Sequence, residues 1–379
     1  MTDEKINKID ETKKINEINS TVPSEKRDSG VLSNLRSENF CTDSAEVDIV
    51  MFTKKLVEIS SVSGNESELA VFISEMLSKD FKIQKQKVGN ACNIIATRGN
   101  PRIIFNTHLD TVPGKIAITE DEFYLTGRGS CDAKGSMAAM ILSAIESAKE
   151  GMTNFGLVFD VCEETDFSGV KEALNLVKPE IVVIGEPTNR EIVIGQKGLL
   201  GIKIICKGKA AHGSTPEIGE CANTKLIFAL QKILALKLPE DERLGKTTLN
   251  IGLINGGNAI NVIPNYAEAT LEFRTTVSNE KVITLLACVK NIADIEIMYS
   301  YESVIMEDTH DVNLSKTVVP YFTTLYFWSK IAKAFVFGPG DPAYAHMENE
   351  KVEKKQIVEA KEVYKKLLQN YATKESMEK

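Results

Sequence analysis

The residues most able to do chemistry are histidines and acids that come directly after short apolar runs. His108 and Asp110 follow the run Arg102–Asn106 and stand two positions apart. At the two-residue period of a β-strand their side chains share one face, so the Asp110 carboxylate can hydrogen-bond one ring nitrogen of His108. Such a bond fixes the tautomer of a histidine whose other ring nitrogen binds a metal ion.

Three more acids follow two further apolar runs. Glu163 and Glu164 come at the end of FGLVFDV (155–161), and Glu186 comes after IVVIG (181–185). In open α/β sheets, binding sites form beyond the carboxyl ends of the strands. The sequence therefore predicts that His108 and these acids meet at one edge of a sheet.

Two glycine-rich stretches complete a candidate set of metal ligands. Asp132 lies in GRGSCDAKGSM, and His346 lies in FVFGPGDPAYAHMENE after a late apolar run. The full set is His108, Asp132, Glu164, Glu186 and His346. A mixture of imidazole and carboxylate suits zinc, and also cobalt or manganese. Five ligands exceed one tetrahedral ion, so we expect two ions about 3.5–4 Å apart, bridged by one carboxylate and one water.

Each motif taken alone has a simpler explanation. A lone His-x-Asp pair is usually a helix cap or a surface pair, and two adjacent glutamates usually end a solvated strand or helix. An aspartate in a glycine-rich loop is usually a turn residue. The metal-site prediction therefore depends on all of the motifs occurring together, each at the end of a strand.

The elements that must position these residues alternate between strands and helices. Apolar spacing predicts helices at 47–60, 65–79, 136–149, 169–177 and 353–372, and strands at 102–106, 155–161, 181–185 and 334–337. This alternation predicts an α/β domain whose mixed, mostly parallel sheet is flanked by helices.

The pattern changes between residues 192 and 300. Strands are predicted at 199–207, 247–253, 260–275 and 294–300, around helices at 221–237 and 279–290. This βαββαβ order predicts a smaller α+β domain inserted into the first one. We therefore expect a discontinuous catalytic domain of residues 46–191 and 301–379, and an inserted domain of residues 192–300.

Composition limits the other possibilities. The 379 residues carry a net charge of −8 and no long Lys/Arg block, so we expect no nucleic-acid partner. No apolar run approaches the ~18–20 residues of a membrane span. Residues 1–45 are polar and are predicted to be disordered, without a catalytic role. The seven cysteines are irregularly spaced and no apolar leader segment is present, which indicates the cytoplasm.

Five motifs in order carry a resemblance to a known family. They are the run His108-Leu109-Asp110-Thr111-Val112-Pro113, then GRGSCDAKG, CEET, GEPT and GPGD…AH, and the match covers about residues 46–379. The chain resembles the zinc-dependent amidohydrolases and exopeptidases of peptidase family M20, which include acetylornithine deacetylase, succinyl-diaminopimelate desuccinylase, aminoacylase and carboxypeptidase G2. The resemblance implies a hydrolase that cuts an amide bond in a small N-acylated amino acid.

The resemblance also implies a role for each candidate residue. Asp132 would bridge the two ions, and Asp110 would orient His108. His108 and Glu186 would complete one metal site, with Glu164 and His346 completing the other. Glu163 would be the general base that takes the proton of the attacking water.

In the inserted domain, the resemblance implies a lid that also forms a homodimer. His212 would reach the active site of the partner subunit, and Asn261 and Arg274 would bind the carboxylate of the substrate. Without the resemblance, His212 would be interpreted as a loop histidine, and Arg274 as an exposed partner of Glu268 or Glu272. His310 matches no motif and is predicted to lie on the surface.

The substrate is less well specified than the chemistry. Acetylornithine deacetylase is the first expectation, succinyl-diaminopimelate desuccinylase the second, and a dipeptidase or carboxypeptidase the third. The alternative of another class is a non-catalytic metal-binding relative, which the presence of Glu163 beside the five ligands disfavours. The stretch PYFTTLYFWSK (320–330) stands where the family often has a Ser-Asp or Thr-Asp pair, so the acyl group and the side chain stay open.

Overall fold

The computed structural model describes residues 48–306 and 314–374. The predicted disordered tail at 1–45 and the predicted surface residue His310 lie outside these ranges. Among the described residues, no helix combines the length and the apolar character that crossing a membrane requires.

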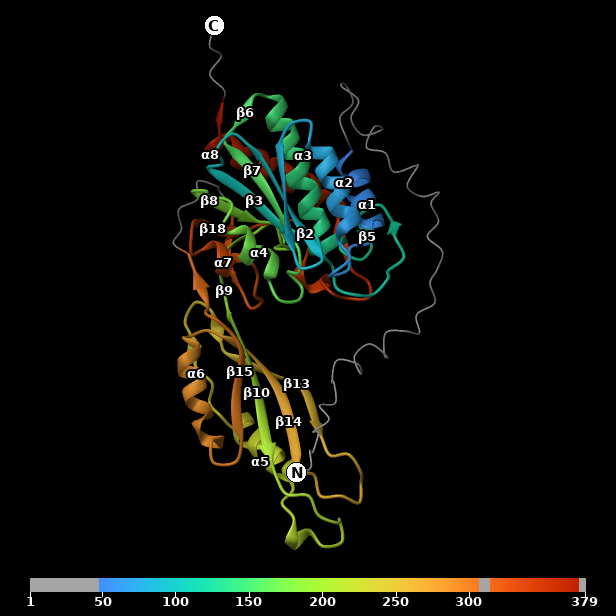
Figure 1. The fold of residues 1–379 in the computed structure, drawn as a ribbon. Coiled ribbons are helices and arrows are strands. Elements are labelled where there is room, and N and C mark those ends of the chain that lie inside the picture. The colour runs from blue at the N-terminus through green and yellow to red at the C-terminus, as the bar shows by residue number, and fades with distance from the viewer. Residues whose placement is uncertain (1–47, 307–313, 375–379) are drawn as a thin grey trace, which may run out of the picture. The chain divides into compact units, whose positions relative to one another are not determined.

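A large mixed sheet forms the centre of the α/β fold (Figure 1). Within the described ranges its strands follow the order β1–β2–β7–β3–β8–β18–β9–β16, and β17 also pairs with β9. Their bounds are β1 Lys82–Val88, β2 Ala91–Arg98, β3 Ile103–His108, β7 Phe155–Asp160, β8 Ile181–Ile184, β9 Ile192–Gln196, β16 Val304–Ile305, β17 Lys316–Val319 and β18 Lys333–Val336.

The predicted mixed sheet flanked by helices is confirmed, although parallel pairing is less extensive than expected. Strands β7, β3, β8 and β18 run parallel to one another, whereas β1–β2, β2–β7, β18–β9 and β16–β9 are antiparallel pairs. The β1–β2 hairpin was missed in the sequence, although Gly89-Asn90 is the two-residue turn between Val88 and Ala91. The outer strand β1 is mostly polar, so it lacks the alternation of apolar and polar residues by which a strand is predicted.

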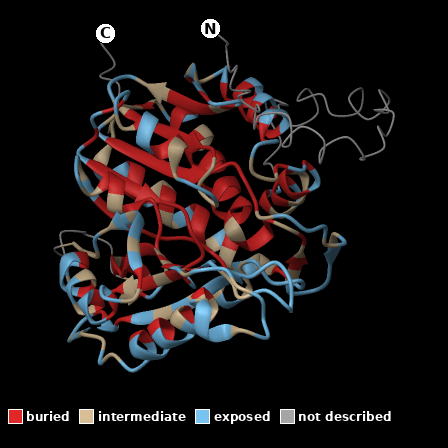
Figure 2. Ribbon diagram, turned by 60° about the horizontal axis from the view of Figure 1, so that its bottom comes forward, coloured by how far each residue is buried: buried red, intermediate tan, exposed pale blue. Residues whose placement is uncertain are grey.

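The strands of this sheet are largely buried (Figure 2), and apolar side chains on its two faces form two cores. Alternate residues of a strand point to opposite faces. Ile103 and Phe105 of β3 therefore join the core beneath α1 (Ile49–Glu58), α2 (Ser67–Leu77), α3 (Gly135–Lys149) and α8 (Lys354–Tyr371). Ile104 joins the second core, together with residues of α4 (Ser168–Ala173) and α7 (Leu325–Trp328).

A second sheet is formed by β13–β14–β10–β15 and has a core of its own. The elements follow along the chain as β10 (Gly198–Lys207), α5 (Ala222–Leu234), β13 (Thr248–Gly256), β14 (Tyr266–Thr275), α6 (Asn279–Leu285) and β15 (Asp294–Tyr301). Strand β9, which the predicted boundary at residue 192 assigns to the inserted domain, pairs within the large sheet. Strand β14 begins later than the predicted residue 260, because Pro264 has no N–H to donate to a ladder.

Short strands complete the fold. They are β4 (Thr119–Glu120), β5 (Tyr124–Thr126) and β19 (Lys351–Glu353) in one sheet, β11 (Glu240–Asp241) with β12 (Gly245–Lys246), and β6 (Met152–Thr153) with β20 (Thr373–Lys374). The β5–β19 pair brings residues just after His346 back beside the start of α3.

A buried polar network lies under the edge of the large sheet where the acids gather. The Asn106 amide accepts hydrogen bonds from Trp328 Nε1 at 2.8 Å and Thr324 Oγ1 at 3.0 Å, and it donates to Asp160 Oδ2 at 2.7 Å. Burial raises the pKa of Asp160 to about 7. Asn106 therefore links β3, β7 and the 320–330 stretch through one side chain.

Replacing Asn106 with alanine should lower the free energy of unfolding by about 2–4 kcal/mol, because it leaves buried polar groups of Trp328, Thr324 and Asp160 without their partner. Chemical denaturation at fixed metal content measures this loss. Asn175→Ala, at an exposed position, is the matched control and should change stability by less than about 0.5 kcal/mol. Equal losses in the two variants would show that the network contributes nothing.

Candidate metal centre

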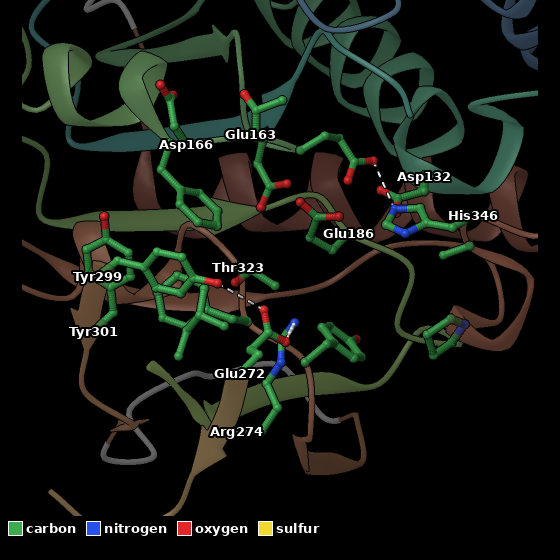
Figure 3. Close-up of a pocket in the computed structure, with 18 of the residues that line it drawn as sticks. Asp132, Glu163, Asp166, Glu186, Glu272, Arg274, Tyr299, Tyr301, Thr323 and His346 are labelled. Carbon is green, nitrogen blue, oxygen red and sulfur yellow. Dashed lines mark hydrogen bonds and ion pairs between the residues drawn. The ribbon is translucent and has the colours of Figure 1, made fainter. Parts of the chain in front are cut away.

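The five predicted ligands lie together at one edge of the large sheet. His108 Nε2 is 3.0 Å from Asp132 Oδ1 and 3.7 Å from Glu186 Oε2. His346 Nε2 is 3.2 Å from Asp132 Oδ2 and 3.0 Å from Glu164 Oε1. The two oxygens of Asp132 thus face different histidines, and the five side chains form two groups that share Asp132. Figure 3 shows Asp132 beside His346, with Glu186 next to them.

Parallel strands bring three of these residues to the same edge. His108 is the last residue of β3 and is 2% exposed, Glu164 lies in the loop that follows β7, and Glu186 comes two positions after β8. β3 pairs in parallel with both β7 and β8, so the three carboxyl ends meet. These positions follow directly from the strand ends visible in the sequence.

Asp110 supports the loop after β7 and also lies beside the ring of His108. Its carboxylate accepts hydrogen bonds from the backbone N–H groups of Glu163 at 3.1 Å and Glu164 at 3.2 Å, and from Ser63 Oγ at 2.7 Å. The carboxylate oxygen is 3.6 Å from His108 Nδ1, whereas the backbone carbonyl of Asp110 is 2.9 Å from it. The backbone carbonyl is thus the nearer partner of Nδ1, and the carboxylate lies close to the same nitrogen. A carbonyl can only accept, so Nδ1 carries a proton, and in the neutral ring Nε2 has the lone pair that a metal ion would need.

Asp132 is held by a buried carboxylate that the sequence analysis missed. Glu350 accepts hydrogen bonds from the backbone N–H groups of Cys131 at 3.1 Å and Asp132 at 3.0 Å. Arg128 Nη1 is 2.7 Å from the other Glu350 oxygen. Gly129, at φ +81°, makes the left-handed turn that lets this loop enter α3. Arg128 and Glu350 lie 222 positions apart, and no sequence pattern around either residue indicates their contact.

His346 is held in an uncommon backbone conformation. Its φ is +65°, a left-handed value that costs a non-glycine residue on the order of 1–3 kcal/mol. The His346 side chain is 51% exposed, in contrast to that of His108. Strained residues of this kind cluster at functional sites, where surrounding contacts hold them in place.

The acids of this cluster repel one another. Burial, and then the charge of Glu186, raise the pKa of Glu163 well above its usual range. Burial raises the pKa of Glu186 to about 8. Asp132 behaves differently: burial alone would raise its pKa, but hydrogen bonds from His108 and His346 hold it below its usual range. The bonds to Asp132 and Glu164 raise the pKa of His346 to about 10.

These properties fit divalent cations. Ligand atoms of His108, Asp132 and Glu164 all lie within 4.8 Å of one another. Zinc bonds to nitrogen and oxygen are about 2.0–2.2 Å long, so two ligands of one ion stand roughly 3–4 Å apart. A cation would also relieve the repulsion that raises the carboxylate pKa values. The donor set and its charge therefore suit a metal centre.

A cavity of about 640 Å³ opens onto the cluster. Glu163 lines it beside Asp132, Glu164 and Glu186. Arg274 of β14 also lines it, with Nη2 at 2.9 Å from Glu272 Oε1. Arg274 therefore pairs with Glu272, one of the two acids expected from the sequence, and it also lines the cavity.

His212 and Asn261 do not line this cavity. Both are exposed, and they lie side by side, with the Gly213 N–H donating to the Asn261 carbonyl at 2.8 Å. His212 Nδ1 accepts from the backbone N–H of Ser214 at 3.2 Å and is 2.7 Å from Ser214 Oγ. An accepting Nδ1 leaves the proton of the neutral ring on Nε2, where it can be donated.

The chain is similar to known proteins over most of its length. Residues 194–296 match the peptidase dimerisation domain of the M20 family. An M20 peptidase domain-containing protein of Schizosaccharomyces pombe is 31% identical over 340 residues, covering 84% of each chain. A probable carboxypeptidase of Talaromyces marneffei is 32% identical over 384 residues, covering 83% of this chain and 84% of that one.

Solved structures share the fold at lower identity. A tripeptidase from Staphylococcus aureus superposes with a TM-score of 0.74 at 20% identity, covering 85% of this chain and 98% of that one. A dinuclear metal-binding peptidase of the M20 family from Bacillus subtilis has a TM-score of 0.63 at 15% identity, covering 84% and 96%.

Fold, cluster and relatives together define a hydrolase with a candidate metal centre. The chain belongs to the peptidase M20 family, since the identity to its relatives extends over most of both sequences.

His346→Ala should lower the zinc bound after dialysis by about one ion per chain, because it removes the imidazole of a candidate ligand. Elemental analysis after dialysis against a low zinc concentration measures the content. His212→Ala, which also removes a histidine, should keep two ions. Two tightly held ions in His346→Ala would contradict its role as a ligand.

Proposed function

We propose that this chain cleaves the amide bond beside the carboxyl-terminal residue of a dipeptide, a short peptide or an N-acylated amino acid. The observation that supports this most directly is that the five candidate ligands form one cluster, and that all of them except His108 line one cavity together with Glu163. The relatives named as carboxypeptidase and tripeptidase favour a peptide substrate.

We propose two zinc ions as cofactors, with cobalt or manganese as other ions that suit the same donors. Asp132 would contact both ions, His108 and Glu186 would hold one, and Glu164 and His346 the other. When bound, such ions lower the pKa of a water molecule and polarise a carbonyl. The dinuclear relative from Bacillus subtilis supports the number of ions.

Glu163 is the proposed general base. It lines the cavity beside the cluster, and burial raises its pKa, so its carboxylate has a high affinity for a proton. In the proposed reaction Glu163 takes a proton from the attacking water and then delivers it to the leaving amine. Its presence beside a complete set of ligands also argues against a non-catalytic metal-binding protein.

Arg274 is proposed to hold the free carboxylate of the substrate. Glu272 engages one nitrogen of its guanidinium, but this group has five N–H donors, and others can bind a carboxylate. Fixing the carboxylate would orient the amide bond next to it.

An acetylornithine deacetylase activity is the narrower proposal from the sequence, followed by desuccinylation of succinyl-diaminopimelate. The same cluster and Glu163 would serve for either acyl group. The names of the relatives rank peptides ahead of both. Hydrolysis of acetylornithine, succinyl-diaminopimelate and simple dipeptides therefore belongs in one substrate panel.

We propose residues 46–191 and 301–379 as the catalytic domain, and residues 192–300 as a lid through which two chains form a homodimer. The match to the peptidase dimerisation domain supports this role. Large apolar side chains are exposed on α5 and on the edge strand β13, namely Ile227, Phe228, Leu234, Leu253 and Ile254. Their burial against a second copy would remove apolar area from water.

His212 is proposed to act in the cavity of the partner subunit, with Asn261 beside it. The exposed Nε2–H of His212 is a donor suited to a developing oxyanion. Neither residue lines the cavity of its own chain, which supports a contribution across the dimer.

We propose a cytoplasmic location. The six cysteines in the described parts of the chain are all free thiols, as expected of a reducing compartment.

Glu163→Gln should lower kcat by at least about 10²–10⁴-fold on whichever substrate of the panel is hydrolysed, because the amide cannot take a proton. Metal content should stay unchanged. Glu122→Gln, at an exposed loop position, is the control and should keep full activity. Near-normal turnover by Glu163→Gln would overturn the assignment, and absence of hydrolysis across the whole panel by the wild type would overturn the proposed function.

His212→Ala should also be nearly inactive, yet mixing it with Glu163→Gln should restore activity. Random exchange makes half of the dimers mixed, each with one intact site, so about a quarter of wild-type activity is expected. Turnover after subunit exchange measures the recovery. Failure of a mixture whose exchange is demonstrated by mass spectrometry would show that the sites are not shared.

A further inference from the structure

One side of the cavity is built from aromatic side chains that the proposed chemistry does not use. Its lining includes Phe167, Tyr299, Tyr301, Tyr321 and Phe322. Figure 3 shows Tyr299 and Tyr301 across the cavity from Asp132 and His346. Tyr321 and Phe322 belong to the 320–330 stretch that departs from the family pattern.

The register of the second sheet places two of these rings beside Arg274. Arg274 on β14, Leu199 on β10 and Tyr301 on β15 are direct cross-strand partners. Residues that face one another across neighbouring strands point to the same face of a sheet. Arg274 and Tyr301 therefore stand in one row, with the smaller Leu199 between them.

The neighbouring row of cross-strand partners positions the ring of Tyr299. Glu272, Gly201 and Tyr299 are partners across the same strands. A side-chain carbon added at Gly201 would lie 2.3 Å from the Tyr299 ring, so the ring rests directly on the glycine. The Tyr299 hydroxyl donates to Glu272 Oε2 at 3.3 Å. Gly201 thus lets Tyr299 lie across β10 towards the acid that pairs with Arg274.

The rings support one another. Tyr299 stacks on Tyr301 with 6.3 Å between centroids and 11° between planes, and Tyr301 stacks on Phe322 at 5.5 Å and 26°. Phe167 meets Phe322 edge to face at 5.3 Å, and Lys171 Nζ lies 5.3 Å from the Tyr301 centroid. Contacts of this kind fix ring orientation, so a flat ligand meets a surface already in place.

We propose that Tyr299, Tyr301 and Phe322, the aromatic wall, bind an aromatic or large apolar side chain of the substrate residue whose carboxylate Arg274 holds. This inference rests on the proposed function, because Arg274 supplies the orientation. Arg274 and Tyr301 are two strand spacings apart, about 10 Å at Cα. One carboxyl-terminal residue can then place its carboxylate at Arg274 and its own side chain at Tyr301. The enzyme then prefers phenylalanine, tyrosine or leucine over alanine at that position.

The test compares Gly-L-Phe with Gly-L-Ala on the zinc-loaded full-length protein. The wild type should show a kcat/KM at least about 10-fold higher for Gly-L-Phe. Tyr301→Leu, which keeps an apolar side chain, should lower this ratio severalfold, mainly through a higher KM for Gly-L-Phe. Gly201→Ala should lower it as well, because the new methyl group displaces Tyr299 without removing any ring.

Tyr326→Leu is the matched control. Its ring contacts Tyr301 and Phe322 at 5.4 and 5.8 Å but does not line the cavity. A disturbance of packing alone would therefore change the ratio in this variant too. The inference requires that Tyr326→Leu keep the wild-type ratio while Tyr301→Leu does not.

A binding measurement separates this inference from the proposed function. Calorimetry with free L-phenylalanine and L-alanine probes the wall without turnover. Equal hydrolysis of both dipeptides would leave the proposed function standing and overturn the inference. Tighter binding of L-phenylalanine that Tyr301→Leu abolishes would uphold the inference even if neither dipeptide is cleaved, and equal binding of the two amino acids would overturn it.

Discussion

The repulsion among buried carboxylates is the constraint around which this protein is organised. Asp132, Glu163, Glu164 and Glu186 lie at one cavity; His108 contacts Asp132 and Glu186, and His346 contacts Asp132 and Glu164. Burial raises the pKa of the three glutamates, so their ionised forms are costly in the absence of a compensating positive charge. A protein keeps such an arrangement where a bound cation compensates for it.

The surrounding structure holds the acidic side chains of the cluster close together despite their repulsion. Parallel strands bring their carboxyl ends to one edge, and two further carboxylates fix the connecting loops. Asp110 binds the backbone N–H groups of Glu163 and Glu164, and Glu350 binds that of Asp132. Acids here serve two purposes: some face the cavity, and others hold backbone amides behind it. Backbone support of this kind keeps charged side chains in one geometry.

The two sheets contribute different properties to the same cavity. The large sheet supplies the cluster, and the second sheet supplies Arg274, Tyr299 and Tyr301 from rows of aligned residues. The 320–330 stretch connects them, because Phe322 stacks on Tyr301 while Trp328 binds the Asn106 network beneath the cluster. The proposed chemistry and the proposed selectivity therefore belong to different elements of the fold.

The sequence by itself identified the candidate ligands and most of the elements that position them. His108 and Glu186 follow strand runs, and the helical period of α3 is plain, because local pattern and burial coincide there. Only tertiary structure decided that Asp110 would bind backbone amides, that Glu350 would hold Asp132 from 218 positions away, and that Tyr299 would rest on Gly201. Such contacts depend on which strands and loops lie next to one another in the fold. The residues adjacent to either partner in the sequence do not predict this arrangement.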